Sequence, residues 1–157
     1  MSRMHRGAAV AVATLALAAT ASAATVHKSD THANTINLVE AHKELQPTLV
    51  DTGTPGPSVG DLAIARDEVL FENGSPAGTS QQTCTLVDVA SSPFTSTFEC
   101  AGSIALHDGT ITTEGSFVPS TPEQDGAIAA GTGAYKTARG EVVIRAKADQ
   151  IIVKLAR

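Results

Sequence analysis

The chain has 157 residues, a formal net charge of −5, one tyrosine and no tryptophan. This length fits one domain, and the acidic balance argues against nucleic acid or an anionic membrane as a partner, because such binders need a basic face. The scarcity of large aromatic residues also leaves few side chains on which bases or flat sugar rings would stack.

The first 23 residues have the pattern of a secretory signal peptide. Arg3 and Arg6 supply a basic start, residues 8–19 are mostly Ala, Val and Leu, and Ala21-Ser-Ala23 is a small-residue cleavage site. The apolar run is shorter than the roughly 20 residues that cross a bilayer. We therefore expect cleavage after Ala23 and a secreted, extracellular product without a membrane anchor.

Residues 24–34 are polar and follow no strand or helix period, so we expect a disordered N-terminus before the domain. His27 and His32 lie in this segment, but no cluster of carboxylates or cysteines accompanies them to complete a metal site. The sequence therefore predicts no metal and no cofactor.

The domain is expected to span residues 35–157 and to begin with a strand and a loop. Residues 35–42 alternate weakly, with Ile36 and Leu38 on one side, and are predicted to form the first strand. Residues 46–59 are predicted to form a loop across one end of the fold, because their prolines cannot donate ladder hydrogen bonds and their glycines loosen the chain.

Residues 61–71 are predicted to form the second strand, whose apolar residues change from even positions, such as Leu62, to odd positions, such as Phe71. A β-bulge at Arg66-Asp-Glu68 would reconcile the two halves. Because bulges occur beside binding sites as well as at barrel rims, Arg66 and Glu68 are candidate ligand-binding residues. The competing interpretation is an exposed, charged bend.

The sequence around Asp108-Gly109 predicts a two-residue hairpin turn. Centring the hairpin there sets Gly102 opposite Gly115 and makes one face of both strands apolar. Two facing glycines leave a hole in that face. Either Tyr135 fills the hole, or the glycines let the sheet coil into a barrel, or they give room for a ligand.

A looser turn at Ser91-Ser-Pro93 then sets Cys84 directly opposite Cys100 on the neighbouring antiparallel strand. At such positions the α-carbons lie about 5 Å apart, within disulfide reach. We therefore predict a disulfide that stabilises the fold by about 3 kcal/mol in the chain-entropy model. The short spacing of the cysteines and the lack of tryptophan argue against an immunoglobulin-like sandwich.

Three further strands are predicted toward the C-terminus. A short strand over residues 126–130 follows a loop at residues 120–125, and residues 141–148 and 151–155 form a final hairpin with a turn at Asp149-Gln150. In its first strand, inward positions are expected at Val142, Ile144, Ala146 and Ala148.

Residues 131–140, with the sequence GTGAYKTARG, form the densest local motif. Gly131 and Gly133 allow a sharp change of direction, and Gly140 releases the chain into the next strand. Residues 134–138 contain no helix breaker and are predicted to hold one helical turn.

This turn would place Tyr135 and Arg139 four residues apart on one side. A dinucleotide-binding fingerprint would need a third glycine where Lys136 stands. A structural corner plugged by Tyr135 is therefore favoured over a phosphate-binding loop.

The pattern Gly131-Thr-Gly-x-Tyr-x-x-Ala-Arg-Gly140, with Gly60-Asp61 before it, resembles the dirigent and allene oxide cyclase barrel superfamily. It is similar in particular to small secreted bacterial members, which carry a stretch like Gly56-Pro-Ser-Val-Gly-Asp61. The resemblance covers residues 35–157 and implies an all-β domain, a single eight-stranded antiparallel barrel with a central cavity. It also implies Tyr135 and Arg139 as candidate ligand-binding residues, and a homodimer or homotrimer.

Two classes of function remain open, and a hydrolase is not among them, because the sequence contains no nucleophile with a matching base. In the first, the barrel is a non-hydrolytic binding or structural module that holds an apolar small molecule, and Arg139 pairs with Asp61 or Asp67. In the second, it is a cyclase or isomerase that restricts the conformation of a reactive apolar substrate. The residues favour the first.

Overall fold

The computed structural model describes residues 35–41 and 47–156, so the predicted signal peptide and N-terminal tail lie outside the described residues. The described chain is almost entirely β, with three short 3₁₀ turns. The strands are β1 (Thr35–Ala41), β2 (Thr48–Val50), β3 (Leu62–Phe71), β4 (Pro76–Asp88), β5 (Thr97–Leu106), β6 (Gly109–Phe117), β7 (Gln124–Gly131), β8 (Gly140–Arg145) and β9 (Gln150–Leu155), and the turns are η1 (Pro93–Thr95), η2 (Gly133–Tyr135) and η3 (Ala146–Ala148).

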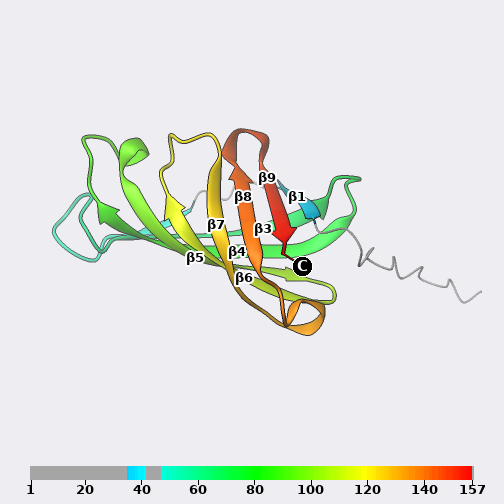
Figure 1. The fold of residues 1–157 in the computed structure, drawn as a ribbon. Helices are drawn as coiled ribbons and strands as arrows, with labels where there is room; N and C mark the ends of the chain where they lie inside the picture. Colours follow the sequence, from blue (N-terminus) through cyan, green and yellow to red (C-terminus); the bar gives the residue numbers. More distant parts are fainter. Residues whose placement is uncertain (1–34, 42–46, 157) are drawn as a thin grey trace, which may run out of the picture.

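Eight strands close into an antiparallel barrel, which confirms the predicted fold (Figure 1). The order is β1-β9-β8-β7-β6-β5-β4-β3, and β1 closes the ring by pairing with β3, where Leu38 lies opposite Phe71. β2 is an addition to this ring. It pairs with residues 62–64 at the start of β3, on the edge that β1 uses further along the same strand.

The loop predicted over residues 46–59 therefore contains a strand. Thr48, Leu49 and Val50 are residues that extended chains favour or tolerate, and they lie between Pro47 and Gly53, so no glycine or proline interrupts them. The loop interpretation holds for residues 51–59, which contain no strand.

The pairing of β4 with β5 confirms the predicted cysteine register. Cys84 lies opposite Cys100, and Leu86 lies opposite Phe98. The two cysteines form a disulfide, and their α-carbons are 4.0 Å apart.

The predicted register between β5 and β6 is wrong by two residues. The two-residue turn is His107-Asp108, Gly102 lies opposite Thr113, and Gly115 lies opposite Cys100. The cause is a contact from outside the hairpin, because the N–H of Ala134 donates to the carbonyl of Asp108 at 2.9 Å. A shift of two residues keeps every side chain on its predicted face.

The bulge predicted at residues 66–68 is also wrong. β3 and β4 stay in continuous register from Leu62 to Val69, and the register shifts only between Val69 and Leu70. Leu62 and Ile64 instead face outward, beside β2. The odd residues of β3 therefore face the barrel interior throughout, and Asp67 is one of them.

The C-terminal hairpin is shorter than predicted. β8 ends at Arg145, which pairs with Gln150, and the turn between them contains η3 and Asp149 in a left-handed conformation with φ of 51°. Ala146 and Ala148 are exposed in this turn rather than inward on a strand. The helical turn predicted at residues 134–138 is the shorter η2.

The apolar core fills one end of the barrel. Its buried members are Leu38, Val69, Ala77, Ile104, Ile111, Ile128, Tyr135, Val142, Ile151 and Val153. At the other end the barrel is taller on one side, because β4 has 13 residues whereas β8 and β9 have six each. Figure 1 shows the ends of β4, β5 and β6 extending beyond the β8–β9 hairpin.

Candidate functional site

Strand alternation brings three polar side chains into the barrel interior. Ile36 and Leu38 of β1 pack in or against the core, and the same alternation carries Glu40 inward. On β3 the alternation that buries Val69 carries Asp67 inward. Ser80 of β4 lies directly opposite Asp67 in the register.

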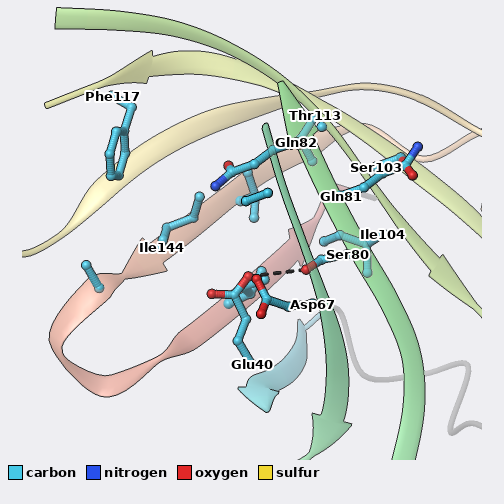
Figure 2. A pocket seen from close by; sticks show the side chains of 15 residues that line it. Glu40, Asp67, Ser80, Gln81, Gln82, Ser103, Ile104, Thr113, Phe117 and Ile144 are labelled. Carbon is cyan, nitrogen blue, oxygen red and sulfur yellow. Dashed lines mark hydrogen bonds between the residues drawn. The ribbon is translucent and has the colours of Figure 1, made fainter. Parts of the chain in front are cut away.

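These three residues meet in the interior (Figure 2). The hydroxyl of Ser80 donates a hydrogen bond to Oε1 of Glu40 at 3.2 Å. Asp67 is 8% exposed and Ser80 is 9% exposed. Glu40 is held from its backbone as well, because its N–H donates to the carbonyl of Asp149 at 2.7 Å. The interior therefore carries two carboxylates from neighbouring strands.

A cavity of about 130 Å³ lies beside these carboxylates. Its lining is apolar on the β8–β9 side and polar on the side of β1, β3 and β4. The lining residues are Glu40, Ala65, Asp67, Ser80, Gln81, Gln82, Gly102, Ser103, Ile104, Thr113, Phe117, Val142, Ile144, Ala146 and Ile151. None of these is a lysine, arginine or histidine, so the charge that the lining contributes is negative.

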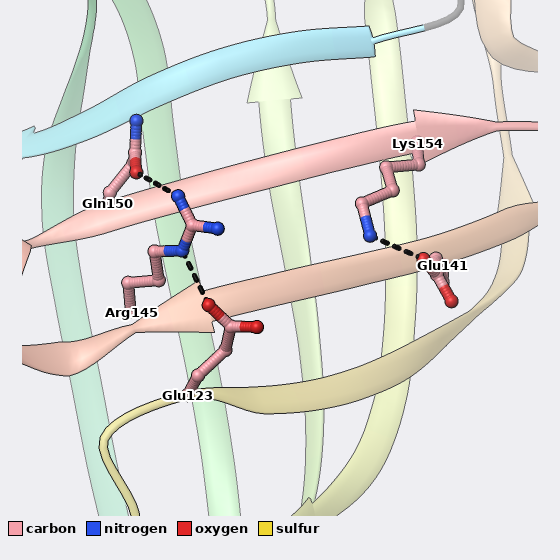
Figure 3. A network of polar contacts seen from close by, with 5 residues as sticks. All are labelled: Glu123, Glu141, Arg145, Gln150 and Lys154. Carbon is pink, nitrogen blue, oxygen red and sulfur yellow. Dashed lines mark hydrogen bonds and ion pairs between the residues drawn. The ribbon is translucent and has the colours of Figure 1, made fainter.

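The cations of β8 and β9 lie on the outer face of the barrel instead (Figure 3). Nε of Arg145 lies 2.6 Å from Oε2 of Glu123, and Nζ of Lys154 lies 2.6 Å from Oε1 of Glu141. Each partner in these pairs is about half exposed. Pairs as accessible as these contribute little stability.

A second, smaller cavity of about 40 Å³ adjoins the first and shares Gln82, Gly102 and Thr113 with it. Gly102 and Gly115 both line this smaller cavity, although they do not face each other. A Cβ on Gly115 would lie 3.0 Å from the α-carbon of Gly126, so part of the space beside Gly115 is taken by β7.

The two charged candidates on β3 face away from this interior. Arg66 and Glu68 are exposed on the outer face of the barrel. Arg66 lines an open groove of about 400 Å³ there, with Gln81, Thr83 and Ser103 among its other residues. The structure therefore does not bring Arg66 or Glu68 to the cavity.

Tyr135 packs at the opposite end, in the core, and is absent from the lining of both cavities. Gly131 lets the chain fold back here, because a Cβ at this position would collide with the carbonyl oxygen of Tyr135. Gly133 and Gly140 have φ of 57° and 134°, which favour glycine. Burial, with a hydrogen bond to Asp108, raises the pKa of Tyr135 to about 12.

Arg139 is exposed, and its guanidinium donates to the carbonyl of Ala138 at 2.6 Å. The expected pairing of Arg139 with Asp61 or Asp67 is therefore wrong, because Asp67 is buried in the barrel interior and the carboxylate of Asp61 binds other groups. The carboxylate of Asp61 accepts hydrogen bonds from the N–H of Thr52 at 3.0 Å and from the N–H of Ser58 at 2.7 Å. These donors lower the pKa of Asp61 and fix the loop over residues 51–60.

Sequence reasoning missed Glu40, Asp67 and Ser80 as site residues. A signal for Glu40 was present, since it continues the even-numbered alternation of Ile36 and Leu38. Asp67 was missed because the apolar residues at the start of β3 face outward. Their even-numbered positions suggested that the inward face of the strand changes partway along it. Ser80 has no local signal, because its place follows from pairing with β3.

Two general properties of the described residues bear on the site. They include no group of three His, Cys, Asp or Glu side chains placed to hold a metal ion. None of the helical segments in the same residues is long and apolar enough to cross a membrane.

Comparison with known proteins places this geometry in a family. The family model described as the allene oxide cyclase barrel like domain matches residues 39–153. A solved structure of pyocyanin demethylase is 29% identical, with a TM-score of 0.64, over 78% of this chain and 99% of that chain.

Two further solved structures share the fold at lower identity. The Diels-Alderase AbmU from Streptomyces koyangensis is 16% identical with a TM-score of 0.54, over 77% of this chain and 61% of that one. A pterocarpan synthase dirigent protein is 20% identical with a TM-score of 0.52, over 75% and 80% of the two chains. No curated protein matches in sequence. Because the family model spans nearly the whole described barrel, the chain belongs to the allene oxide cyclase barrel-like family.

Proposed function

We propose that the barrel binds a small molecule in its interior, with an apolar body and a positively charged or proton-donating atom held by Glu40 and Asp67. The observation that carries this proposal is the 130 Å³ cavity, which is lined on one side by aliphatic residues and on the other by two carboxylates and Ser80. Binding pockets combine a mainly apolar lining with a few placed polar groups in this way.

The size of the cavity limits the ligand. An apolar protein cavity of about 150 Å³ binds benzene, so 130 Å³ accommodates a group close to one aromatic ring. The adjoining 40 Å³ gives room for a small substituent toward Gly102 and Gly115. A larger ligand would place one ring inside and the remainder at the open end of the barrel.

The charge of the lining refines the apolar ligand expected from the sequence. The lining of the cavity contains the carboxylates of Glu40 and Asp67 and no lysine, arginine or histidine. A cationic ligand is attracted to such a lining, whereas an anionic ligand is repelled by it. The similarity to pyocyanin demethylase supports a small-molecule ligand.

A disulfide within the barrel supports the further proposal that the protein works outside the cytoplasm. Cys84 and Cys100 are paired, and structural disulfides persist mainly in oxidising compartments. The signal peptide expected at residues 1–23 agrees with this location.

Ring-sized probes of different charge test the ligand proposal. N-methylpyridinium, toluene and benzoate have similar shapes but are cationic, neutral and anionic, and their dissociation constants can be compared by NMR titration. We expect N-methylpyridinium to bind most tightly and benzoate most weakly. Asp67→Asn and Glu40→Gln should each weaken N-methylpyridinium binding about tenfold or more, since each removes a charge-assisted contact.

Glu68→Gln is the matched control, because it removes the same charge from the neighbouring outward position. Equal loss of binding in Glu68→Gln and Asp67→Asn would indicate a general charge effect and contradict the proposal. Ala65→Leu should block the cavity, whereas Ala105→Leu, on an exposed outward position of β5, should leave binding intact.

A second candidate function is an isomerase or cyclase that confines a reactive substrate. The contact between Ser80 and Glu40, beside buried Asp67, favours it, because a positioned carboxyl group can move a proton during such a reaction. The protein would be incubated with a metabolite extract and analysed by mass spectrometry. A new product that Asp67→Asn fails to form would support catalysis. If a ligand binds and no new product forms, binding is the only function supported.

A further inference from the structure

A row of inward-facing residues crosses the barrel wall beside the carboxylates. Gln82 of β4 lies between two small residues, Ala65 of β3 and Gly102 of β5. On the next strand, β6, Thr113 lies opposite Gly102. Ser80 precedes Gln82 by two residues on the same face of β4, so the row lies about 7 Å along the strand from Ser80. This spacing is close to the length of one aromatic ring with its substituents.

The glycine leaves a gap in this row. A Cβ at Gly102 would lie 3.1 Å from the hydroxyl oxygen of Thr113 and 3.5 Å from Cβ of Gln82. A hydroxyl and an amide therefore border the space above Gly102, which we call the Gly102 gap. The gap opens to both cavities, because Gln82, Gly102 and Thr113 line the cavity of 130 Å³ and the cavity of 40 Å³.

The two polar groups at the gap are available to a ligand. Among the described residues, neither the side-chain amide of Gln82 nor the hydroxyl of Thr113 has a hydrogen-bond partner. Both residues are only partly buried, so water can reach these groups in the ligand-free protein. Figure 2 shows the Gln82 amide extending from β4 into the interior. A ligand that covers both groups without bonding to them loses affinity, because they are left unsatisfied.

We propose that the Gly102 gap binds a neutral hydrogen-bonding group of the ligand, such as a carboxamide or a carbonyl, between Gln82 and Thr113. This inference rests on the proposed function and adds a second feature to the same ligand. An amide and a hydroxyl each donate and accept hydrogen bonds, so they suit a carboxamide on both counts. A carboxylate is disfavoured here, because the nearby charges of Glu40 and Asp67 repel it.

The ligand class becomes more specific as a result. It is an aromatic ring with a positively charged or proton-donating atom toward Asp67 and Glu40, and with a neutral polar substituent on the far side of the ring. The spacing of about 7 Å between Ser80 and Gln82 along β4 allows one ring to reach both ends. Gln82 and Thr113 would then determine which substituent the barrel accepts.

Benzamide and isopropylbenzene test the gap, because they are similar in shape and both neutral, but only benzamide forms strong hydrogen bonds. Their dissociation constants can be measured by NMR titration. Thr113→Val and Gln82→Met each remove one hydrogen-bonding group with little change in size. Each variant should lower the ratio of benzamide affinity to isopropylbenzene affinity about threefold to tenfold. Thr83→Val is the matched control on an exposed, outward position of β4 and should keep the wild-type ratio.

An unchanged ratio in both variants would overturn the inference, and so would an equal fall in Thr83→Val. The two probes are uncharged, so the result is separate from the charge preference of the carboxylates. If the ratio falls although N-methylpyridinium binds no better than toluene, the inference stands and the proposed charge preference is wrong. If N-methylpyridinium binds best and the ratio does not fall, the proposed function stands and this inference is wrong. Binding of none of these probes would overturn both.

Discussion

The ionisation of Tyr135 offers a direct test of how the glycine-rich segment closes the barrel. Tyr135 is the single tyrosine of a chain without tryptophan, so the ultraviolet absorbance of tyrosinate reports this residue alone. Burial and the hydrogen bond to Asp108 raise its pKa to about 12, whereas a tyrosine in an unfolded chain titrates near about 10.

The raised pKa predicts how stability depends on alkaline pH. The folded state holds the tyrosine proton more tightly than the unfolded state, so the contribution is constant below about pH 10 and is lost as pH rises toward about 12. Two pKa units correspond to at most about 2.7 kcal/mol. Because water reaches exposed Asp108 and screens its charge, we expect a smaller loss of about 1 to 2 kcal/mol.

The assay is a rapid pH jump, which reads tyrosinate absorbance before the protein unfolds, followed by urea unfolding at several pH values. Tyr135→Phe should be about 1 kcal/mol less stable at neutral pH, through loss of the hydrogen bond, and should lack the fall in stability between pH 10 and 12. A titration midpoint near 10 in the folded protein, equal to that in urea, would refute the buried position of Tyr135.

Three further results are expected. Asp61→Asn should make the free energy of unfolding depend less on pH in acid. The lowered pKa of Asp61 contributes stability above about pH 3.9 that is lost as pH falls further. The same loss of stability in acid for the variant and the wild type would contradict the hydrogen-bonded loop. Replacing Cys84 and Cys100 together by serine should lower the free energy of unfolding in urea by about 3 kcal/mol, and a change below about 1 kcal/mol would show that the disulfide constrains little. Gly131→Ala should destabilise by about 3 kcal/mol, since its Cβ meets a backbone carbonyl, while Ala130→Ser, on an exposed neighbour, should melt like the wild type.

Elements whose signals are local could be predicted from the sequence. The turn before β5 brings Cys84 opposite Cys100, and that register is confirmed. The turn at residues 107–108 was predicted one residue too late, because its position depends on a hydrogen bond from Ala134, in a segment distant along the chain. An error of one residue in the turn moves the register by two, so the apolar face was still predicted correctly.

The candidate site was harder to predict because it depends on pairings between distant strands. Asp67 faces inward with Val69 because odd-numbered residues of β3 face the interior throughout. The apolar residues Leu62 and Ile64 lie outward beside β2, and no pattern within residues 61–71 reveals that pairing. The charged residues that drew attention, Arg66 and Glu68, are conspicuous in sequence because they are exposed. Gly102 and Gly115 were associated with a hole, and both line the smaller cavity, although their predicted pairing is wrong.

The pairing of β1 with β9 has a consequence for how the barrel folds. β1 and β9 stand at opposite ends of the described chain, with Ile36 opposite Val153, so this contact requires a loop of more than a hundred residues to close. Contacts this distant in sequence slow folding. Until β9 is available, β1 and β8 each present an unpaired edge, and a chain truncated before Gln150 would keep both. Such a fragment should aggregate through these edges, although most of its hairpins would be intact.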